Sequence, residues 1–139
     1  MNKASSIEWI TIAYHDLKSA QILFEADHYT DSIGSDLQQS IEKLLKSILA
    51  SDNKKIPKTH DLYEIYDLID ALILEELEIN ILHIATEYLK EDRYPNPNYS
   101  LPPKDEIKGV LDFTDKLFEY VLKMLKIERC DVIDDLQNK

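Results

Sequence analysis

Three features of this 139-residue sequence predict an all-α fold. Glycine occurs only twice, at Gly34 and Gly109, which leaves little glycine for the turns of a β-sheet protein. Leu, Ile, Lys, Glu and Asp are abundant, and apolar residues recur at intervals of three and four, as in amphipathic helices. The length and a 44% hydrophobic content suit one domain. We therefore expect a single helical domain over residues 1–139, with a core at about 5–126 and a polar, fraying tail at 127–139.

The first half of the chain predicts two long helices. Ser5 and Glu8 have the spacing of a capping box, and the helix that they open ends near Ala26. Its predicted buried face consists of Trp9, Ile12, Ala13, Leu17, Ala20, Leu23 and Phe24. A second helix follows Ser32 and stops at the polar run 51–55. Its predicted buried face consists of Ile33, Leu37, Ile41, Leu44, Leu45, Ile48 and Leu49.

The third helical region begins after Pro57, which keeps the chain extended, and Thr59 is its expected cap. Leu62, Ile65, Tyr66 and Ile69 form its first apolar face. The apolar pattern continues to Tyr88 without Gly or Pro, so periodicity alone permits one helix of about 30 residues. We expect a break near 74–76 instead.

The segment KEDRYPNPNYSLPP, residues 90–103, holds four of the five prolines and ends the preceding helix. A last helix then opens with Lys104, Asp105 and Glu106. Its predicted buried face consists of Ile107, Val110, Leu111, Leu117, Phe118, Val121, Leu122 and Leu125. Helices of roughly 20 residues are about 30 Å long, and short connections between them favour an antiparallel up-and-down bundle.

Composition disfavours several classes of function. The formal net charge of −11 repels nucleic-acid phosphates, so RNA binding would need a local basic patch. Cys130 is the single cysteine, which fits a reducing cytoplasm, and neither a signal peptide nor an apolar run of about 18 residues is present. Glycine-rich phosphate loops and the G-x-S-x-G and H-E-x-x-H motifs are also absent. We expect a cytoplasmic, non-membrane protein without a metal site or cofactor, and the sequence favours a non-enzyme.

Three groups of polar residues are candidates for a site. Gln39, Lys43 and Lys46 lie at positions i, i+4 and i+7 of the second helix. They form either a solvated face or a surface that binds a phosphate or a partner. The cluster Lys54, Lys55, Lys58, Thr59, His60 and Asp61 leads into a helix N-terminus, which either attracts an anion or is simply capped. Arg93, followed by Tyr94, either caps a helix end or recognises a phosphate or carboxylate.

Four stretches together resemble the HEPN domain family, the higher-eukaryote and prokaryote nucleotide-binding domains. They are Trp9 with Ala13 and Asp16-Leu17, QQSIEKLLKSIL at 38–49, PKTHDL at 57–62 and DRYPN at 92–96. Their order and spacing are similar to the branch with a QQ-x-x-EK-x-L-K helix, a THDL turn and an RYP turn, over roughly residues 5–125. The resemblance implies an antiparallel bundle of four long helices plus a short helix after THDL, and homodimers.

Members of this branch are often paired with small nucleotidyltransferases and resemble the C-terminal helical domain of kanamycin nucleotidyltransferase. The leading hypothesis is therefore a module that binds a nucleotide or a partner nucleotidyltransferase, in a two-component system that could be a toxin and antitoxin. The expected nucleotide-binding residues are Gln39, Lys43, Lys46, His60, Arg93 and Tyr94.

Two alternatives remain open. Many other HEPN proteins are ribonuclease toxins in which an arginine is followed by four to six residues and then a histidine. After Arg93 the corresponding positions are Asn98, Tyr99 and Ser100, so the histidine is missing. A metal-independent ribonuclease would have to use Arg93 and His60 as its catalytic residues. Alternatively, Gln39, Glu42, Lys43 and Arg93 form an internal network in a purely structural dimeric bundle.

Overall fold

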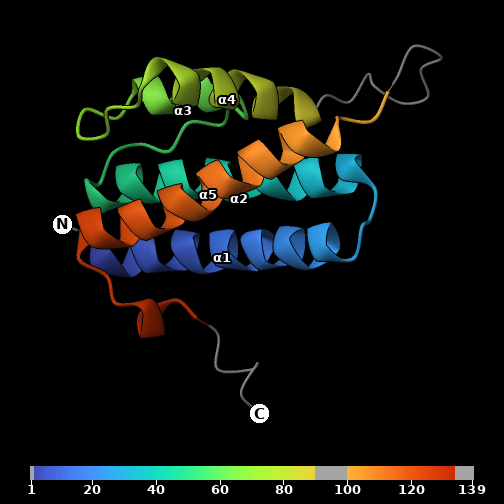
Figure 1. Cartoon of the computed structure of the whole chain (residues 1–139). Helices are drawn as coiled ribbons and strands as arrows, with labels where there is room; N and C mark the ends of the chain where they lie inside the picture. The colour runs from blue at the N-terminus through green and yellow to red at the C-terminus, as the bar shows by residue number, and fades with distance from the viewer. Residues whose placement is uncertain (1, 90–99, 134–139) are drawn as a thin grey trace.

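The computed structural model describes residues 2–89 and 100–133, and its helices form an up-and-down bundle (Figure 1). The helices are α1 (Lys3–Glu25), α2 (Thr30–Ser51), α3 (Leu62–Asp67), α4 (Glu76–Thr86) and α5 (Lys104–Leu125), with short 3-10 turns η1 (Glu87–Leu89) and η3 (Arg129–Asp131). The two described ranges contain no strand. The expected all-α bundle, with four longer helices and a short one after THDL, is confirmed.

Helices α2 and α5 lie in the middle of the bundle. Helix α1 packs on one side of this pair, and α3 and α4 cover the other side (Figure 1). Every residue of the predicted apolar faces of α2 and α5 is buried. None of the helices in these ranges is long and apolar enough to cross a lipid bilayer.

Small residues let α1 approach α2 closely. Ser40 Oγ donates to the Ala13 carbonyl at 2.8 Å, and Ser6 Oγ donates to the Ser47 carbonyl at 2.9 Å. These contacts place Ser6 and Ile10 in the seam, whereas the predicted Ile12 is 48% exposed. The predicted face of α1 was wrong at Ile12 because apolarity alone does not reveal a seam in which serines replace large side chains.

Two predicted helix caps were also wrong. Asn2 Oδ1 accepts from the Ser5 N–H, so α1 is capped at Asn2 and not at Ser5. Asp61 Oδ1 accepts from the Tyr63 and Glu64 N–H groups in the first turn of α3, while Thr59 Oγ1 accepts from the Asp61 N–H and shapes the turn before the helix. In both places the side chain that satisfies the exposed N–H groups lies directly before the helix.

The predicted break between the third and fourth helices is confirmed, and it is wider than expected. Helix α3 ends at Asp67, and α4 begins only at Glu76. The connecting segment remains packed because Ile69 and Leu72 are buried and the Leu74 N–H donates to the Tyr66 hydroxyl at 2.9 Å.

The chain after α5 also differs from the expected polar tail. Lys126 adopts left-handed backbone angles and reverses the chain direction. Ile127 and Val132 then return to the core, with 5% and 1% exposure. The core therefore extends beyond residue 126, and residues 134–139 lie outside the described ranges.

Helix α2 and η1 meet at a glycine. A Cβ atom on Gly34 would lie 2.9 Å from Tyr88 Cγ, closer than packed carbons approach each other. The ring cannot swing away easily, because the Tyr88 hydroxyl donates to Glu106 at 2.7 Å on α5. Gly34 thus permits the close packing of α2, η1 and α5.

We predict that Gly34→Ala destabilises the protein by about 1–3 kcal/mol, because the added methyl group overpacks this contact. Gly109→Ala is the matched control: nothing lies within 4 Å of its added Cβ, and the change should stabilise α5 by about 0.5–1 kcal/mol. Urea unfolding of both variants measures the difference. Equal stabilities would contradict the predicted overpacking.

Candidate functional site

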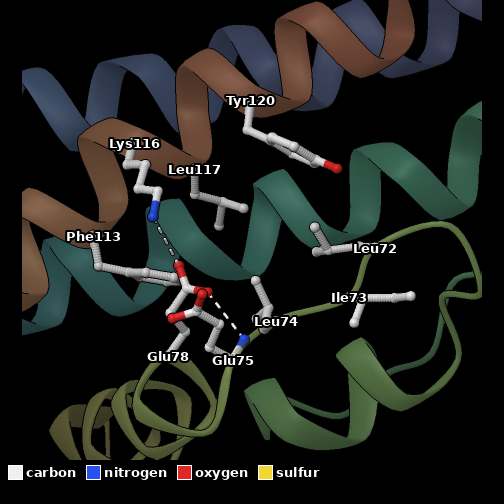
Figure 2. A pocket seen from close by; sticks show the side chains of 9 residues that line it. All are labelled: Leu72, Ile73, Leu74, Glu75, Glu78, Phe113, Lys116, Leu117 and Tyr120. Carbon is white, nitrogen blue, oxygen red and sulfur yellow. Dashed lines mark hydrogen bonds and ion pairs between the residues drawn. The ribbon is translucent and has the colours of Figure 1, made fainter.

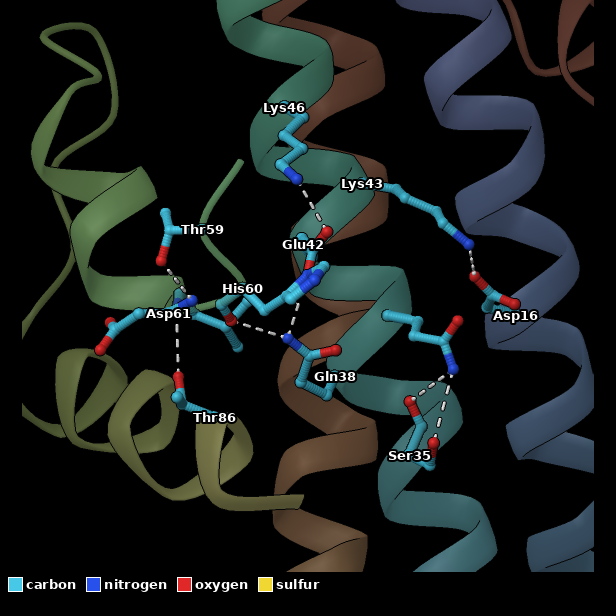
Figure 3. A network of polar contacts seen from close by, with 12 residues as sticks. Asp16, Ser35, Gln38, Glu42, Lys43, Lys46, Thr59, His60, Asp61 and Thr86 are labelled. Atoms are coloured by element: carbon cyan, nitrogen blue, oxygen red, sulfur yellow. Dashed lines mark hydrogen bonds and ion pairs between the residues drawn. The ribbon is translucent and has the colours of Figure 1, made fainter. Parts of the chain in front are cut away.

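A buried polar stripe runs along one face of α2. Gln38, Glu42 and Lys46 stand four residues apart, which places them on successive turns of the same helical face. All three are buried, with exposures of 0%, 7% and 5%. Figure 3 shows His60, from the segment between α2 and α3, lying against this stripe.

The Glu42 carboxylate is the centre of the cluster. Its Oε2 atom accepts from Lys46 Nζ at 2.8 Å, and its Oε1 atom contacts both Gln38 Nε2 at 3.2 Å and His60 Nδ1 at 2.9 Å (Figure 3). Lys46 Nζ also lies 5.9 Å from the centroid of the Trp9 ring, so an aromatic face helps to compensate for its burial. The ion pair is thus surrounded by partners from three parts of the chain.

These contacts determine the ionisation of Glu42. Burial raises the pKa of this carboxyl, but hydrogen bonds from Lys46, His60 and Gln38 outweigh it, and the net pKa is lowered. The carboxylate is therefore ionised at neutral pH and can only accept hydrogen bonds. His60 Nδ1 must then carry the hydrogen of this contact, which leaves Nε2 as the ring nitrogen that faces away from the carboxylate.

The backbone around His60 is held as firmly as its ring. Gln38 Nε2 donates to the His60 carbonyl at 2.9 Å, and the Leu62 N–H donates to Thr86 Oγ1 of α4 at 3.0 Å. Leu62 is fully buried. These contacts account for the backbone conformation of residues 59–62. They do not account for the His60 side chain, which is 72% exposed.

A second polar group lies between α2 and α1. Lys43 Nζ forms an ion pair with Asp16 Oδ2 at 2.7 Å, and both side chains are about one-fifth exposed. Ser19 Oγ donates to Asp36 at 2.7 Å, and burial raises the pKa of the Asp36 carboxyl. Gln39 Nε2 lies 3.4 Å from Ser35 Oγ. In Figure 3, Lys43 extends toward Asp16 of α1, away from His60.

The structure therefore divides the predicted site residues. Gln39, Lys43 and Lys46 lie on neighbouring turns of α2, as their spacing predicts, but their side chains have different partners. Lys46 and His60 share Glu42, Lys43 pairs with Asp16 of α1, and Gln39 contacts Ser35 of α2. Arg93 and Tyr94 lie outside the described residues. Nowhere in residues 2–89 and 100–133 do three His, Cys, Asp or Glu side chains gather so that they could hold a metal ion.

The predicted nucleotide-binding set lacked Gln38 and Glu42. Their spacing with Lys46, four residues and again four, was the available signal, because a Gln, a Glu and a Lys on one face can bond to each other. Within the described ranges the Gln38 Oε1 atom is buried without a hydrogen-bond partner. The amide orientation is nonetheless clear, since its nitrogen donates to two acceptors.

Comparisons with known proteins agree on the family and the fold. A family model described as the HEPN domain matches residues 7–125. TT1696 from Thermus thermophilus is 22% identical and has a TM-score of 0.71, covering 88% of this chain and 98% of that one. ST0689, an archaeal HEPN homologue, is 16% identical with a TM-score of 0.67, covering 86% and 97%. At these identities the two structures support the fold alone. No curated protein matches the chain.

We predict that Lys46→Met destabilises the protein by about 3 kcal/mol, because it leaves the buried Glu42 carboxylate without its main counter-charge. Lys108→Met is the control, since Lys108 forms an i, i+4 pair with Asp112 on the surface, and its loss should be below about 0.5 kcal/mol. Thermal and urea unfolding compare the two. Similar small losses of stability in the two variants would contradict a large contribution of the buried Glu42–Lys46 pair to the free energy of unfolding.

A second prediction concerns pH. The pKa of Glu42 is lower in the folded state, so its stabilising contribution is present above the unfolded pKa and is lost as pH falls through the folded pKa. The free-energy difference between the wild type and Glu42→Gln should therefore be largest near neutral pH and should shrink in acid. Urea unfolding from pH 7 to pH 3 measures it. A difference that stays constant with pH would contradict the assignment.

Proposed function

Because the chain belongs to the HEPN domain family, we propose that it is a binding module for a nucleotide, whose phosphate lies against the His60 imidazole. The family membership rests on the match over residues 7–125. Arg93 is the second proposed phosphate contact, and Tyr94 is proposed to pack against the base or ribose. Gln39, Lys43 and Lys46 then act in positioning, since each already contacts a neighbour on α1 or α2.

One observation supports this proposal above the others: His60 is largely exposed while its Nδ1 atom is held by a buried carboxylate. Ordering an exposed side chain costs conformational entropy, and an exposed ring gains little free energy from burial to offset that cost. The arrangement instead suits recognition, because it directs Nε2 outward in one orientation, from which the ring donates to a phosphate oxygen when both of its nitrogens carry hydrogen. Lys55 and Lys58, both exposed in the same segment, add local positive charge for a phosphate.

The overall charge favours a small ligand over a nucleic acid. A protein with a net charge of −11 repels an extended phosphate backbone, whereas one nucleotide can bind beside a few cations. We further propose a homodimer and a small nucleotidyltransferase partner, in a two-component system of the toxin–antitoxin kind. A nucleotidyltransferase gene beside this one, with co-purification of the two products, would support that arrangement.

A ribonuclease is the second candidate, and the Glu42–His60 pair favours it. A carboxylate that orients a histidine is the arrangement that makes a general base, and Arg93 would stabilise the charge on the cleaved phosphate. RNA fragments that end in cyclic phosphate, lost in His60→Ala and Arg93→Ala, would support this candidate. Intact RNA after expression of the wild type would remove it. A purely structural dimeric bundle is the remaining alternative, and it binds no nucleotide.

We predict that His60→Ala weakens nucleotide binding at least tenfold, because the variant lacks the oriented imidazole. Isothermal titration with a panel of nucleoside mono-, di- and triphosphates measures the effect. His28→Ala, which removes another exposed histidine at the far end of α1, is the matched control and should bind like the wild type. No heat from any nucleotide with the wild type, or equal affinity in His60→Ala, would contradict the proposed site.

A further inference from the structure

One side of the bundle is rich in carboxylates. Residues 61–89 include neither Lys nor Arg, and they contain eight carboxylates: Asp61, Glu64, Asp67, Asp70, Glu75, Glu76, Glu78 and Glu87. This acidic layer, residues 61–89, comprises α3, α4, η1 and the segments between them, and it lies on the opposite side of α2 and α5 from α1 (Figure 1). Two lysines from elsewhere reach it: Lys54 pairs with Asp70, and Lys116 pairs with Glu78.

The same layer exposes large apolar side chains. Ile73 is 86% exposed and Leu77 is 77% exposed, the two highest values among the large hydrophobic residues in the described ranges. Leu68 is also exposed, and Tyr120 adds an exposed ring from the adjacent part of α5. Aliphatic side chains displayed in this way within an acidic surface are typical of a protein interaction site.

Of these side chains, Ile73 and Tyr120 line a pocket of about 200 Å³ between the connecting segment, the start of α4 and α5 (Figure 2). Its apolar lining includes Leu72, Leu74, Phe113 and Leu117, with Ile73 and Tyr120 at its edge. Cavities for whole small-molecule ligands are usually about 300–1,000 Å³, so this pocket is better matched to one large side chain. The salt bridge between Glu78 and Lys116 lies beside it.

We propose that this face docks a basic segment of a partner protein, which inserts one large apolar side chain into the pocket between Leu72 and Tyr120. Charge complementarity identifies the occupant: the carboxylates of the layer attract Lys and Arg around the anchoring side chain. A second copy would bring two layers without lysine or arginine together, and nucleic acid or an anionic membrane would be repelled. The pocket contains none of the residues proposed for the nucleotide site, so the two proposals fail independently.

The test uses two fluorescein-labelled 14-residue peptides. One consists of Lys and Leu in an amphipathic helical order, and the other has Glu in place of every Lys. Fluorescence anisotropy should show saturable binding of the lysine peptide to the full chain, at least tenfold tighter than the glutamate peptide. Ile73→Ser/Leu77→Ser should weaken the binding at least tenfold, whereas Ile12→Ser/Ile22→Ser, which changes two exposed isoleucines of α1, should leave it unchanged.

Three results would overturn the proposal. Binding that falls equally in both double variants, or in neither, would show non-specific adhesion. A wild-type dimer that Ile73→Ser/Leu77→Ser converts to a monomer in light scattering would show an interface between copies of this chain. Circular dichroism checks that Ile73→Ser/Leu77→Ser folds. Asp67→Lys/Glu76→Lys provides a second test, because it reverses the charge of two exposed side chains only. Unchanged affinity for the lysine peptide in that charge variant would exclude the electrostatic basis.

Discussion

The arrangement of this bundle depends on one buried carboxylate. Glu42 is removed from water within α2, which is unfavourable unless its oxygens find donors, and Lys46, Gln38 and His60 supply them. Because His60 comes from the segment after α2, satisfying the carboxylate also determines where that segment lies. The start of α3 at Leu62 and its bond to Thr86 of α4 follow directly from this position.

The two sides of the central helix pair are packed by different means. On the α1 side, serine hydroxyls donate to backbone carbonyls of the opposite helix, so the two helices approach closely with little apolar bulk. On the α4 side, a tyrosine ring lies against Gly34, and its hydroxyl reaches Glu106. Both contacts combine a small residue with a directional hydrogen bond, which specifies one alignment where apolar packing alone would tolerate several.

Sequence periodicity predicted the elements whose burial is continuous. Helices α2 and α5 bury large aliphatic residues on every turn, so spacing alone identified their faces. Helix α1 was predicted less well because Ser6 is buried and Ile12 is exposed, which is the opposite of what the polarity of these two side chains predicts. The site was only partly predictable: Lys46 and Glu42 are neighbours through helical spacing, but the contact of Glu42 with His60 crosses an irregular segment that no periodic rule describes.

The concentration of carboxylates in residues 61–89 gives the molecule an electric dipole moment across the bundle. In the electric field of a charged partner such a molecule rotates before contact, so that its acidic side faces a positively charged partner and its opposite side faces a negatively charged one. Encounter rates would then depend on ionic strength, since the Debye length shortens from about 30 Å at 0.01 M to about 8 Å at 0.15 M salt. Orientation in solution would thus select which face is presented first, before any side chain makes contact.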